Sequence, residues 1–535
     1  MNIIYTKTFR KKLYHYLLPI LLLFLGALLR LFALGEVPGG MHQDESFVAL
    51  NALDLYHEGR DSAGLFWPVY MSSWGDGQSA MYIWLLLPLI ALNGGTVNAF
   101  ICRIPQAAVG ILTLWAVYCL MKYMFNRKIG LISLFFLAIC PWHIMMNRWG
   151  LDANIAPGFL IFALYFFIRG LDKPKYLLLS AFFYGFSLYC YAVIWPIVPF
   201  LLASQGIYAF YHRKISINIT TICAILIVFL LALPLILFVL INSDYLPAIT
   251  LPFMTIPRTM GYRGSELATD LNTFIANLRN ALSLLYHQNT GSPYDVLLPW
   301  GLFYDIGRVF IIFGTLCLLI RFLKGLFRKT FSYEYFLFVS LTGGGLTCLL
   351  VSANLHQINN LFIPLVLCEA YGVYHFLHLL HTKKQQLCHI TAAILFFVYL
   401  TCLILFQRDY YTSYKDLVNA YFAAGVEESV DYALAQCEET GLSTISVEKG
   451  AQWPRLLLHT ETLPSQYLAT VEYDVAPAPA AFTTANGIHI KTRINYDAIS
   501  NDTIYIIYYT DYDRFKEHFT LTPFYDWYVA VPTRE

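Results

Sequence analysis

Runs of mainly apolar residues, each long enough to cross a membrane, recur along the first 406 residues of this 535-residue chain. A helix of roughly 17 to 25 apolar residues spans the ~30 Å hydrocarbon layer, because its backbone polar groups are paired within the helix. Only 13% of the residues are charged, against about 25% in ordinary soluble proteins, which excludes disordered, fibrous and nucleic-acid-binding classes. We assign eleven runs to transmembrane helices: 14–34, 101–124, 129–146, 155–168, 176–192, 194–211, 219–241, 303–323, 333–351, 358–377 and 388–406.

The distribution of basic residues predicts how these helices are oriented across the membrane. A further apolar run, 80–92, is shorter, and we expect it to lie at the membrane interface without crossing. With this run left outside, eighteen Lys and Arg residues and only two acidic residues fall in the loops of one side, as in cytoplasmic loops. The sequence therefore predicts a multi-pass protein of the plasma membrane with a cytoplasmic N-terminus and an extracytoplasmic C-terminus. We expect the cell to be bacterial.

Three long segments fall on the extracytoplasmic side: 35–100, 242–302 and 407–535. The last segment is polar and acidic. A helix-like stretch at 421–439 and strand-like stretches at 443–447 and 504–509 indicate a small α/β domain there. The chain is thus predicted to be a polytopic α-helical membrane protein. Its membrane domain, 1–406, has about 11 transmembrane helices and outer juxtamembrane helices, and an extracytoplasmic α/β domain, 407–535, follows.

The first outer segment is acidic, with seven Asp and Glu residues against one basic residue, Arg60. Its motif Met41-His-Gln-Asp-Glu-Ser46 opens an amphipathic helix, with Asp44 and Glu45 at the helix start. Two interpretations remain open. Either the two acids only stabilise the positive end of the helix, by about 0.3 to 1 kcal/mol, or a carboxylate here is a general base for an acceptor hydroxyl or a metal ligand.

A second outer motif combines one Arg with one Asp between the third and fourth predicted spans: Pro141-Trp-His143, then Asn147-Arg-Trp-Gly-Leu-Asp-Ala-Asn154. In one interpretation, Trp142 and Trp149 anchor the chain at the interface while Arg148 pairs with Asp152. In the other, Arg148 holds a phosphate bidentately and Asp152 orients an acceptor or a metal ion. Arg103, at the outer end of the second span, either reaches toward the interface or faces an anionic headgroup.

These motifs together resemble the polytopic GT-C glycosyltransferases, in particular the group of dolichyl-phosphate-mannose protein mannosyltransferases and aminoarabinose transferases. Their order agrees with the topology derived from charge. Two positions depart from the family pattern: Ser79-Ala80 replace a usual proline, and His356-Gln357 stand where a basic residue such as Arg is expected. The matching segments are Gly40–Ser46, Gly77–Trp84, Arg103–Gly110, Pro141–Asn154, Gly185–Tyr191 and Ala353–Pro364.

The resemblance implies a GT-C fold and transfer of a sugar from a polyprenyl-phosphate-linked donor to an acceptor on the extracytoplasmic face. In an inverting transfer, one carboxylate takes the acceptor proton, and the lipid phosphate leaves as an anion that needs positive partners. As catalytic residues we expect Asp44, the base, and Glu45, its orienting or acceptor-binding neighbour. The other expected site residues are Asp152 and His143 for the acceptor or a metal, and Arg103, Arg148, His356 and Asn359 for the donor phosphate.

Three alternatives remain: a transporter or flippase of lipid-linked glycans, a ligase of wall polymers, and a receptor role of the acidic outer domain. Transport usually needs ionisable groups inside the membrane, and Glu369 is the clear acid within a predicted span. The expected partners are the polyprenyl-phosphate sugar, membrane lipid and an acceptor glycan, lipid or protein, with no nucleic acid. No motif requires a cofactor. The paired acids permit a divalent cation, without a His or Cys cluster at metal-ligand spacing.

Overall fold

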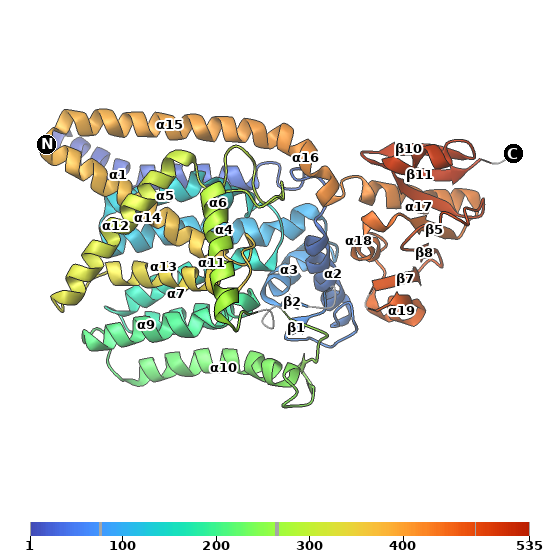
Figure 1. Cartoon of the computed structure of the whole chain (residues 1–535), viewed down its shortest axis with the longest axis horizontal. Helices are drawn as coiled ribbons and strands as arrows, with labels where there is room; N and C mark the ends of the chain where they lie inside the picture. The colour runs from blue at the N-terminus through green and yellow to red at the C-terminus, as the bar shows by residue number, and fades with distance from the viewer. Residues whose placement is uncertain (1, 74–76, 263–266, 477, 534–535) are drawn as a thin grey trace.

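Long apolar helices lie side by side in one part of the molecule, and a β-sheet with short helices forms the other (Figure 1). The computed structural model describes residues 2–73, 77–262, 267–476 and 478–533. Seven of the described helices are long and apolar enough to cross a membrane, which confirms the membrane-protein class, while the number eleven stays a prediction. The predicted spans correspond to α1 (Asn2–Leu31), α4 (Ala99–Met124), α5 (Arg127–Ile139), α7 (Asp152–Gly170), α8 (Tyr176–Ser187), α9 (Ile197–Tyr211), α10 (Ile219–Asn242), α12 (Asp305–Phe327), α13 (Glu334–Leu350), α14 (Phe362–Lys383) and α15 (Gln385–Tyr411).

Asparagine side chains fix where several of these helices begin. Asn98, Asn126 and Asn218 precede α4, α5 and α10, and each side-chain oxygen accepts a hydrogen bond from a backbone N–H of the first turn. These N–H groups have no partner within the helix, so the caps stabilise the helix starts. The cap of α4 thereby sets the position of Arg103, which lies early in that helix.

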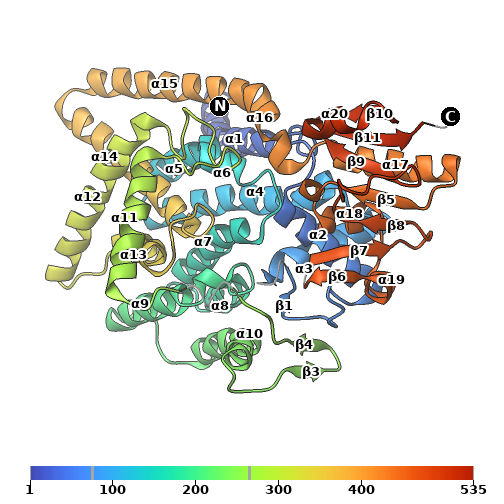
Figure 2. The ribbon, with the colours of Figure 1, turned by 45° about the vertical axis from the view of Figure 1, so that its right-hand side comes forward.

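The first outer segment lies at the end of the helix bundle that carries the C-terminal sheet (Figures 1 and 2), and Figure 1 shows the N-terminus at the other end. The acidic motif opens the predicted helix, α2. Both faces of α2 are buried: Phe47 and Leu50 join the core of the C-terminal sheet, and Leu53 joins the core of the helix bundle. The elements of this segment are α2 (Gln43–Glu58), β1 (Tyr70–Met71), β2 (Gln78–Ser79) and α3 (Met81–Leu92), and α3 is the predicted short apolar helix.

Shorter elements connect the long helices on the predicted outer side. They are α6 (Pro141–Met145), η1 (Ala192–Ile194), β3 (Ile249–Leu251), β4 (Met254–Ile256), α11 (Leu271–His287) and η3 (Asn359–Leu361). Tyr70 of β1 lies against Phe238 of α10, with ring centroids 4.9 Å apart, and Pro68 forms a bridge with Thr255 of β4. The first and second outer segments are therefore packed together.

The C-terminal part is a mixed sheet with the strand order β10-β11-β9-β5-β8-β7-β6, in which β5 runs parallel to both of its neighbours. This arrangement confirms the predicted small α/β unit. Its strands are β5 (Thr444–Val447), β6 (Glu472–Val475), β7 (Ala478–Thr483), β8 (His489–Lys491), β9 (Ile504–Tyr508), β10 (Phe519–Phe524) and β11 (Trp527–Pro532). Its helices are α17 (Val426–Thr440), η4 (Lys449–Ala451), α18 (Trp453–His459), α19 (Pro464–Thr470), η5 (Tyr509–Asp511) and α20 (Tyr512–Phe515).

The boundary between the two parts differs from the predicted position, 407. Helix α15 continues to Tyr411, and the following α16 (Ser413–Phe422) packs its buried aromatic rings into the core of the helix bundle. The core of the sheet part begins at Ala423. Ala423 and Gly425 have φ of 50° and 92°, so the chain turns here, and the helix predicted from 421 begins only at Val426.

Candidate active site

Glu45 is completely buried and ties three segments together. Its Oε1 accepts hydrogen bonds from Arg103 Nε and from the backbone N–H of Gly150, both at 2.8 Å. Its Oε2 accepts from Arg103 Nη2 at 3.0 Å and from the backbone N–H of His42 at 3.2 Å. Both side chains of the Glu45–Arg103 ion pair are excluded from solvent. One carboxylate thus links the start of α2, the start of α4 and the loop before α7.

His42 caps α2 and forms the centre of an aromatic cluster. Its Nδ1 accepts a hydrogen bond from the backbone N–H of Asp44, and Glu45 accepts from the backbone of His42 in return. Such reciprocal capping satisfies N–H groups at the helix start. Burial, and then the charges of Arg455 and His356, lower the pKa of His42 to about 3, so the ring is neutral and can accept. The surrounding rings are Trp149, Tyr294 and Phe422, with centroids 4.9, 5.0 and 5.5 Å away.

Asp44 is the member of the acidic pair that meets solvent. Its side chain is 34% exposed, and its Oδ2 lies 3.7 Å from Nδ1 of His42. Its backbone carbonyl accepts a hydrogen bond from Gln78 Nε2 at 3.4 Å. The two neighbouring acids therefore have different environments: Glu45 is enclosed and bound on both oxygens, whereas Asp44 can be reached from outside.

Arg148 binds the end of α1 and the irregular chain that follows it. It is completely buried and lies with its Cζ 5.2 Å from the ring centre of Tyr410. Its guanidinium donates to Tyr410 Oη and to four backbone carbonyls, those of Leu29, Arg30, Ala33 and Val37. Arg103 continues the same pattern and donates to the carbonyls of Leu34, Pro38 and Gly40. The predicted phosphate contacts of Arg103 and Arg148 gain no support from this geometry, because protein groups occupy both guanidinium groups.

The alternative expectation of an interfacial anchor is wrong for the second outer motif. Trp142 and Trp149 are buried, so neither indole faces a membrane surface. Arg103, which was expected at the interface or at a headgroup, is buried against Glu45. Trp142, Trp149, Arg148 and Arg103 therefore all lie in the protein interior.

Asp152 and His356 complete the polar groups around the aromatic cluster. Asp152 Oδ2 accepts a hydrogen bond from the backbone N–H of Ser79 at 3.0 Å, which connects α7 with β2. The ring of His356, 13% exposed, lies 5.4 Å from Trp149, and its Nε2 lies 2.9 Å from Asp295 Oδ1. Its Nδ1 lies 3.1 Å from Asn154 Oδ1.

Asn359 and His143, the remaining predicted site residues, are buried. Asn359 donates to the carbonyl of Ala153 at 2.9 Å and so joins η3 to α7. The ring of His143 contacts the guanidinium of Arg30 in α1, so it serves the interior of the bundle and not the surroundings of Asp44. Within the described ranges, no three His, Cys, Asp or Glu side chains are arranged to hold a metal ion.

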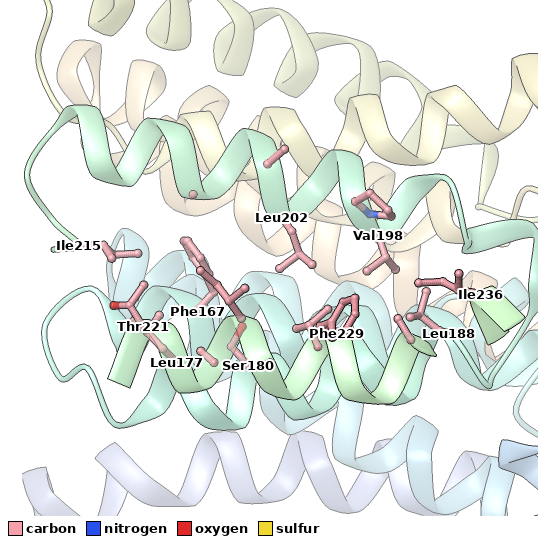
Figure 3. A pocket seen from close by; sticks show the side chains of 18 of the residues that line it. Phe167, Leu177, Ser180, Leu188, Val198, Leu202, Ile215, Thr221, Phe229 and Ile236 are labelled. Carbon is pink, nitrogen blue, oxygen red and sulfur yellow. The ribbon is translucent and has the colours of Figure 1, made fainter. Parts of the chain in front are cut away.

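A large apolar cavity opens between α8, α9 and α10, with a volume of about 840 Å³ (Figure 3). The side chains of Leu202 and Phe229 point into it from opposite helices. The described residues that line it carry no charge. Trp195 lies at the end of the cavity near β1, with its ring 6.2 Å from Tyr70. Because β1 pairs with β2, which carries the Ser79 partner of Asp152, the cavity and the polar site are neighbours.

Sequence reasoning missed several residues of this site. His42 lies three positions before Glu45, which is the spacing of a capping box, and this spacing could have identified it as the cap. Tyr294 and Asp295 lie in the second outer segment and Phe422 at the end of α16, and no local pattern distinguishes them. Only the tertiary structure brings them to α2.

The buried ion pair yields a stability prediction. Glu45→Met or Arg103→Met leaves the partner's charge buried without its counterion, which costs about 3 to 5 kcal/mol. We expect each single variant to lower the thermal unfolding midpoint of the purified protein clearly, and the double variant to lose much less than the sum of the two. Strictly additive losses in this cycle would show that the two charges do not stabilise each other.

Comparison with known proteins places the fold. Residues 78–238 match the family model of dolichyl-phosphate-mannose-protein mannosyltransferases. ArnT from Cupriavidus metallidurans bound to undecaprenyl phosphate is similar in structure, with a TM-score of 0.55 and 9% identity over 96% of this chain and 97% of that chain. The apo state of ArnT has a TM-score of 0.53 at the same identity and coverage. No curated protein matches the sequence.

The oligosaccharyltransferase of Archaeoglobus fulgidus in its apo form has a TM-score of 0.49 and 13% identity, over 84% of this chain and 64% of that chain. Compared with the structure of the same oligosaccharyltransferase in complex with Zn and sulfate, the present chain spans 53% of the length of the oligosaccharyltransferase chain. The fold that the sequence motifs predict is confirmed by the likeness to ArnT over nearly the whole chain. The protein is thus a membrane protein with the GT-C glycosyltransferase fold, and its residues 78–238 carry the sequence pattern of the mannosyltransferase family.

Proposed function

We propose that the protein is a glycosyltransferase that moves a sugar from a polyprenyl-phosphate donor to an acceptor at the extracytoplasmic face. The observation that carries this proposal is the position of Asp44, an accessible carboxylate held at the start of α2 by the buried Glu45–Arg103 pair. The likeness in fold to ArnT, whose structure contains undecaprenyl phosphate, supports the class of donor.

The chemistry proceeds in one displacement. Asp44 takes the proton of the acceptor hydroxyl, and the hydroxyl oxygen forms a bond to the anomeric carbon of the donor sugar. The bond between that carbon and the phosphate oxygen breaks, and polyprenyl phosphate leaves with the bonding electrons. The configuration at the anomeric carbon is inverted. A base for this step must be reachable and held in one geometry, and Asp44 meets both conditions.

Glu45, Arg103 and Arg148 act as positioning residues in this scheme. Both oxygens of Glu45 already accept hydrogen bonds, so this carboxylate orients α2 and takes no proton. Among the residues predicted for the donor phosphate, His356 is partly exposed, while Arg103 and Arg148 are enclosed. We assign the phosphate side of the site to His356 because its ring reaches solvent; the phosphate would replace the Asp295 carboxylate at Nε2, while Nδ1 stays at Asn154. Asn359 supports η3 behind it. Asp152 orients β2 beside the acceptor position.

The apolar cavity between α9 and α10 suits the lipid chain of the donor. Its volume lies in the range of ligand pockets, roughly 300 to 1,000 Å³. Its uncharged, mainly apolar lining suits a hydrocarbon chain but does not suit a soluble sugar. A chain held there would carry its phosphate toward β1 and β2, because Trp195 and Tyr70 lie at that end.

The alternatives have less support. Glu369, the predicted acid within a span, is buried in α14 and accepts a hydrogen bond from Tyr399 Oη at 2.6 Å. A carboxylate locked between two helices does not form the relay that a transporter needs. A wall-polymer ligase would use the same outer site with a longer donor, so the two transferases differ in the glycan that the donor carries.

Replacing the base tests the reaction. Asp44→Asn keeps the shape of the side chain but removes the proton acceptor, and we expect transfer to fall by about 100-fold or more. The measurement is mass spectrometry of surface glycans and glycoproteins from cells that contain the wild-type or the variant protein at equal level.

A matched control exists on the same helix. Asp54 is buried in the middle of α2, and burial and the nearby charges of Asp61 and Glu58 raise its pKa well above the usual value. Asp54→Asn keeps the shape of a side chain that does not reach the site of Asp44, and it should leave transfer unchanged. Retained transfer in Asp44→Asn would refute the assignment of the base.

Filling the cavity tests the lipid site. Ala232→Trp places an indole in the cavity, and we expect undecaprenyl phosphate to lose its stabilising effect on thermal unfolding of the purified protein. Leu230→Trp, at an exposed position of the same helix outside the lining, is the control and should keep that effect. An unchanged shift in Ala232→Trp would place the lipid chain elsewhere.

A further inference from the structure

The C-terminal sheet part holds the chain immediately before Asp44. Arg455 of α18 is nearly completely buried, and its Nε donates a hydrogen bond to the backbone carbonyl of Met41 at 2.9 Å. Its Nη1 donates to Gln452 Oε1 at 3.1 Å, and Gln452 Nε2 contacts Gln43 Oε1 at 2.7 Å. Arg455 of α18 and Gln452, the residue before that helix, therefore contact two of the three residues that precede Asp44.

The same part also supports the rest of α2. Phe47 lies inside its core, with its ring 5.0 Å from that of Trp453. At the far end of α2, the backbone N–H of Ser465 donates to Glu58 Oε2 at 3.0 Å. The helix is thus held along its length, with polar contacts at both ends. The contacts of Arg455 and Gln452 are at the end that carries Asp44.

Arg455 also brings a positive charge to the acidic pair. Burial lowers its pKa to about 10, while attraction by the carboxylates of Glu45 and Asp44 acts in the opposite direction, so the side chain stays charged at neutral pH. A buried guanidinium that donates to a backbone carbonyl fixes that carbonyl in direction, because its N–H groups form a rigid planar fork. The charge and the fork therefore act on the same short segment.

We propose that the C-terminal part is a positioning element of the active site, and that Arg455 and Gln452 are positioning residues that fix the direction of Asp44. This inference rests on the proposed role of Asp44 as base. It gives the sheet part a function that does not require it to touch either substrate. Small displacements of a reacting group lower catalysis strongly: a misplacement of about 1 Å can reduce the rate by 100-fold.

The test compares the two ends of α2 in the full-length protein. Arg455→Gln removes the charge and the fork, Arg455→Lys keeps the charge alone, and Gln452→Leu removes the contact with Gln43. The matched control is Glu58→Ala, which removes the carboxylate that accepts the hydrogen bonds of Ser465 at the far end. The readouts are hydrogen exchange of the peptide that covers residues 36–50, and kcat and KM for sugar transfer.

We expect Arg455→Gln to increase exchange of this peptide severalfold and to lower kcat by roughly 10- to 100-fold, with KM within about twofold. Arg455→Lys should restore part of kcat, and Gln452→Leu should show the same changes to a smaller degree. The control should behave as the wild type. If Arg455→Gln is lost from the membrane, Gln452→Leu decides the question by the same two readouts.

Two results would overturn the inference. One is wild-type exchange and wild-type kcat in both Arg455→Gln and Gln452→Leu. The other is an equal effect in the control, which would show that the C-terminal part only holds α2 in place as a whole. The exchange readout needs no enzymatic activity. If Asp44→Asn retains transfer while Arg455→Gln still loosens residues 36–50, the proposed base is wrong and the contact is real. If exchange is unchanged while Asp44→Asn is inactive, the base stands and the positioning role of Arg455 fails.

Discussion

The buried ion pair between Glu45 and Arg103 is the contact on which the end of the helix bundle next to the C-terminal sheet depends. A carboxylate taken out of water is strongly destabilising unless charge and hydrogen bonds compensate it. Here Arg103 supplies the charge, and the N–H groups of Gly150 and His42 supply the remaining hydrogen bonds. Because these partners come from three segments, the pair fixes their relative positions. Asp44 directly precedes Glu45, so its backbone is fixed by the same contacts, while its side chain remains accessible to solvent.

Arginine side chains hold the backbone of the segment that precedes α2. The last turn of α1 and the irregular chain after it carry carbonyls without a full set of helical hydrogen bonds. Arg148 and Arg103 donate to carbonyls between Leu29 and Gly40 and thus add hydrogen bonds to this stretch of backbone. Guanidinium groups suit this task because each offers five donors. The Arg455 contact with Met41 extends the pattern from the C-terminal part, so arginines from three distant segments hold one stretch of backbone.

Local patterns were sufficient for part of this structure. Length and hydropathy predict the membrane helices, the short helix α3 and the α/β unit, and the acidic motif predicts α2, since each signal lies within one segment. The different environments of Asp44 and Glu45 could not be predicted, because they depend on which side chain faces Arg103. The interpretation of Arg148 as a phosphate ligand likewise lacked knowledge of the tertiary contacts of that side chain. Its partners are backbone carbonyls, which carry no sequence signal, and Arg455 lies more than 400 residues from the carbonyl that it binds.

The stereochemistry of the product tests the role of Asp44 most directly. A lone carboxylate that acts as base gives a single displacement, whereas retention requires a second carboxylate as nucleophile and a covalent intermediate. Glu45, the adjacent acid, is bound on both oxygens and cannot take that part. Nuclear magnetic resonance of the donor and of the purified product gives both anomeric configurations. We predict opposite configurations at the transferred carbon, and the same configuration in both would contradict a mechanism with Asp44 as the base.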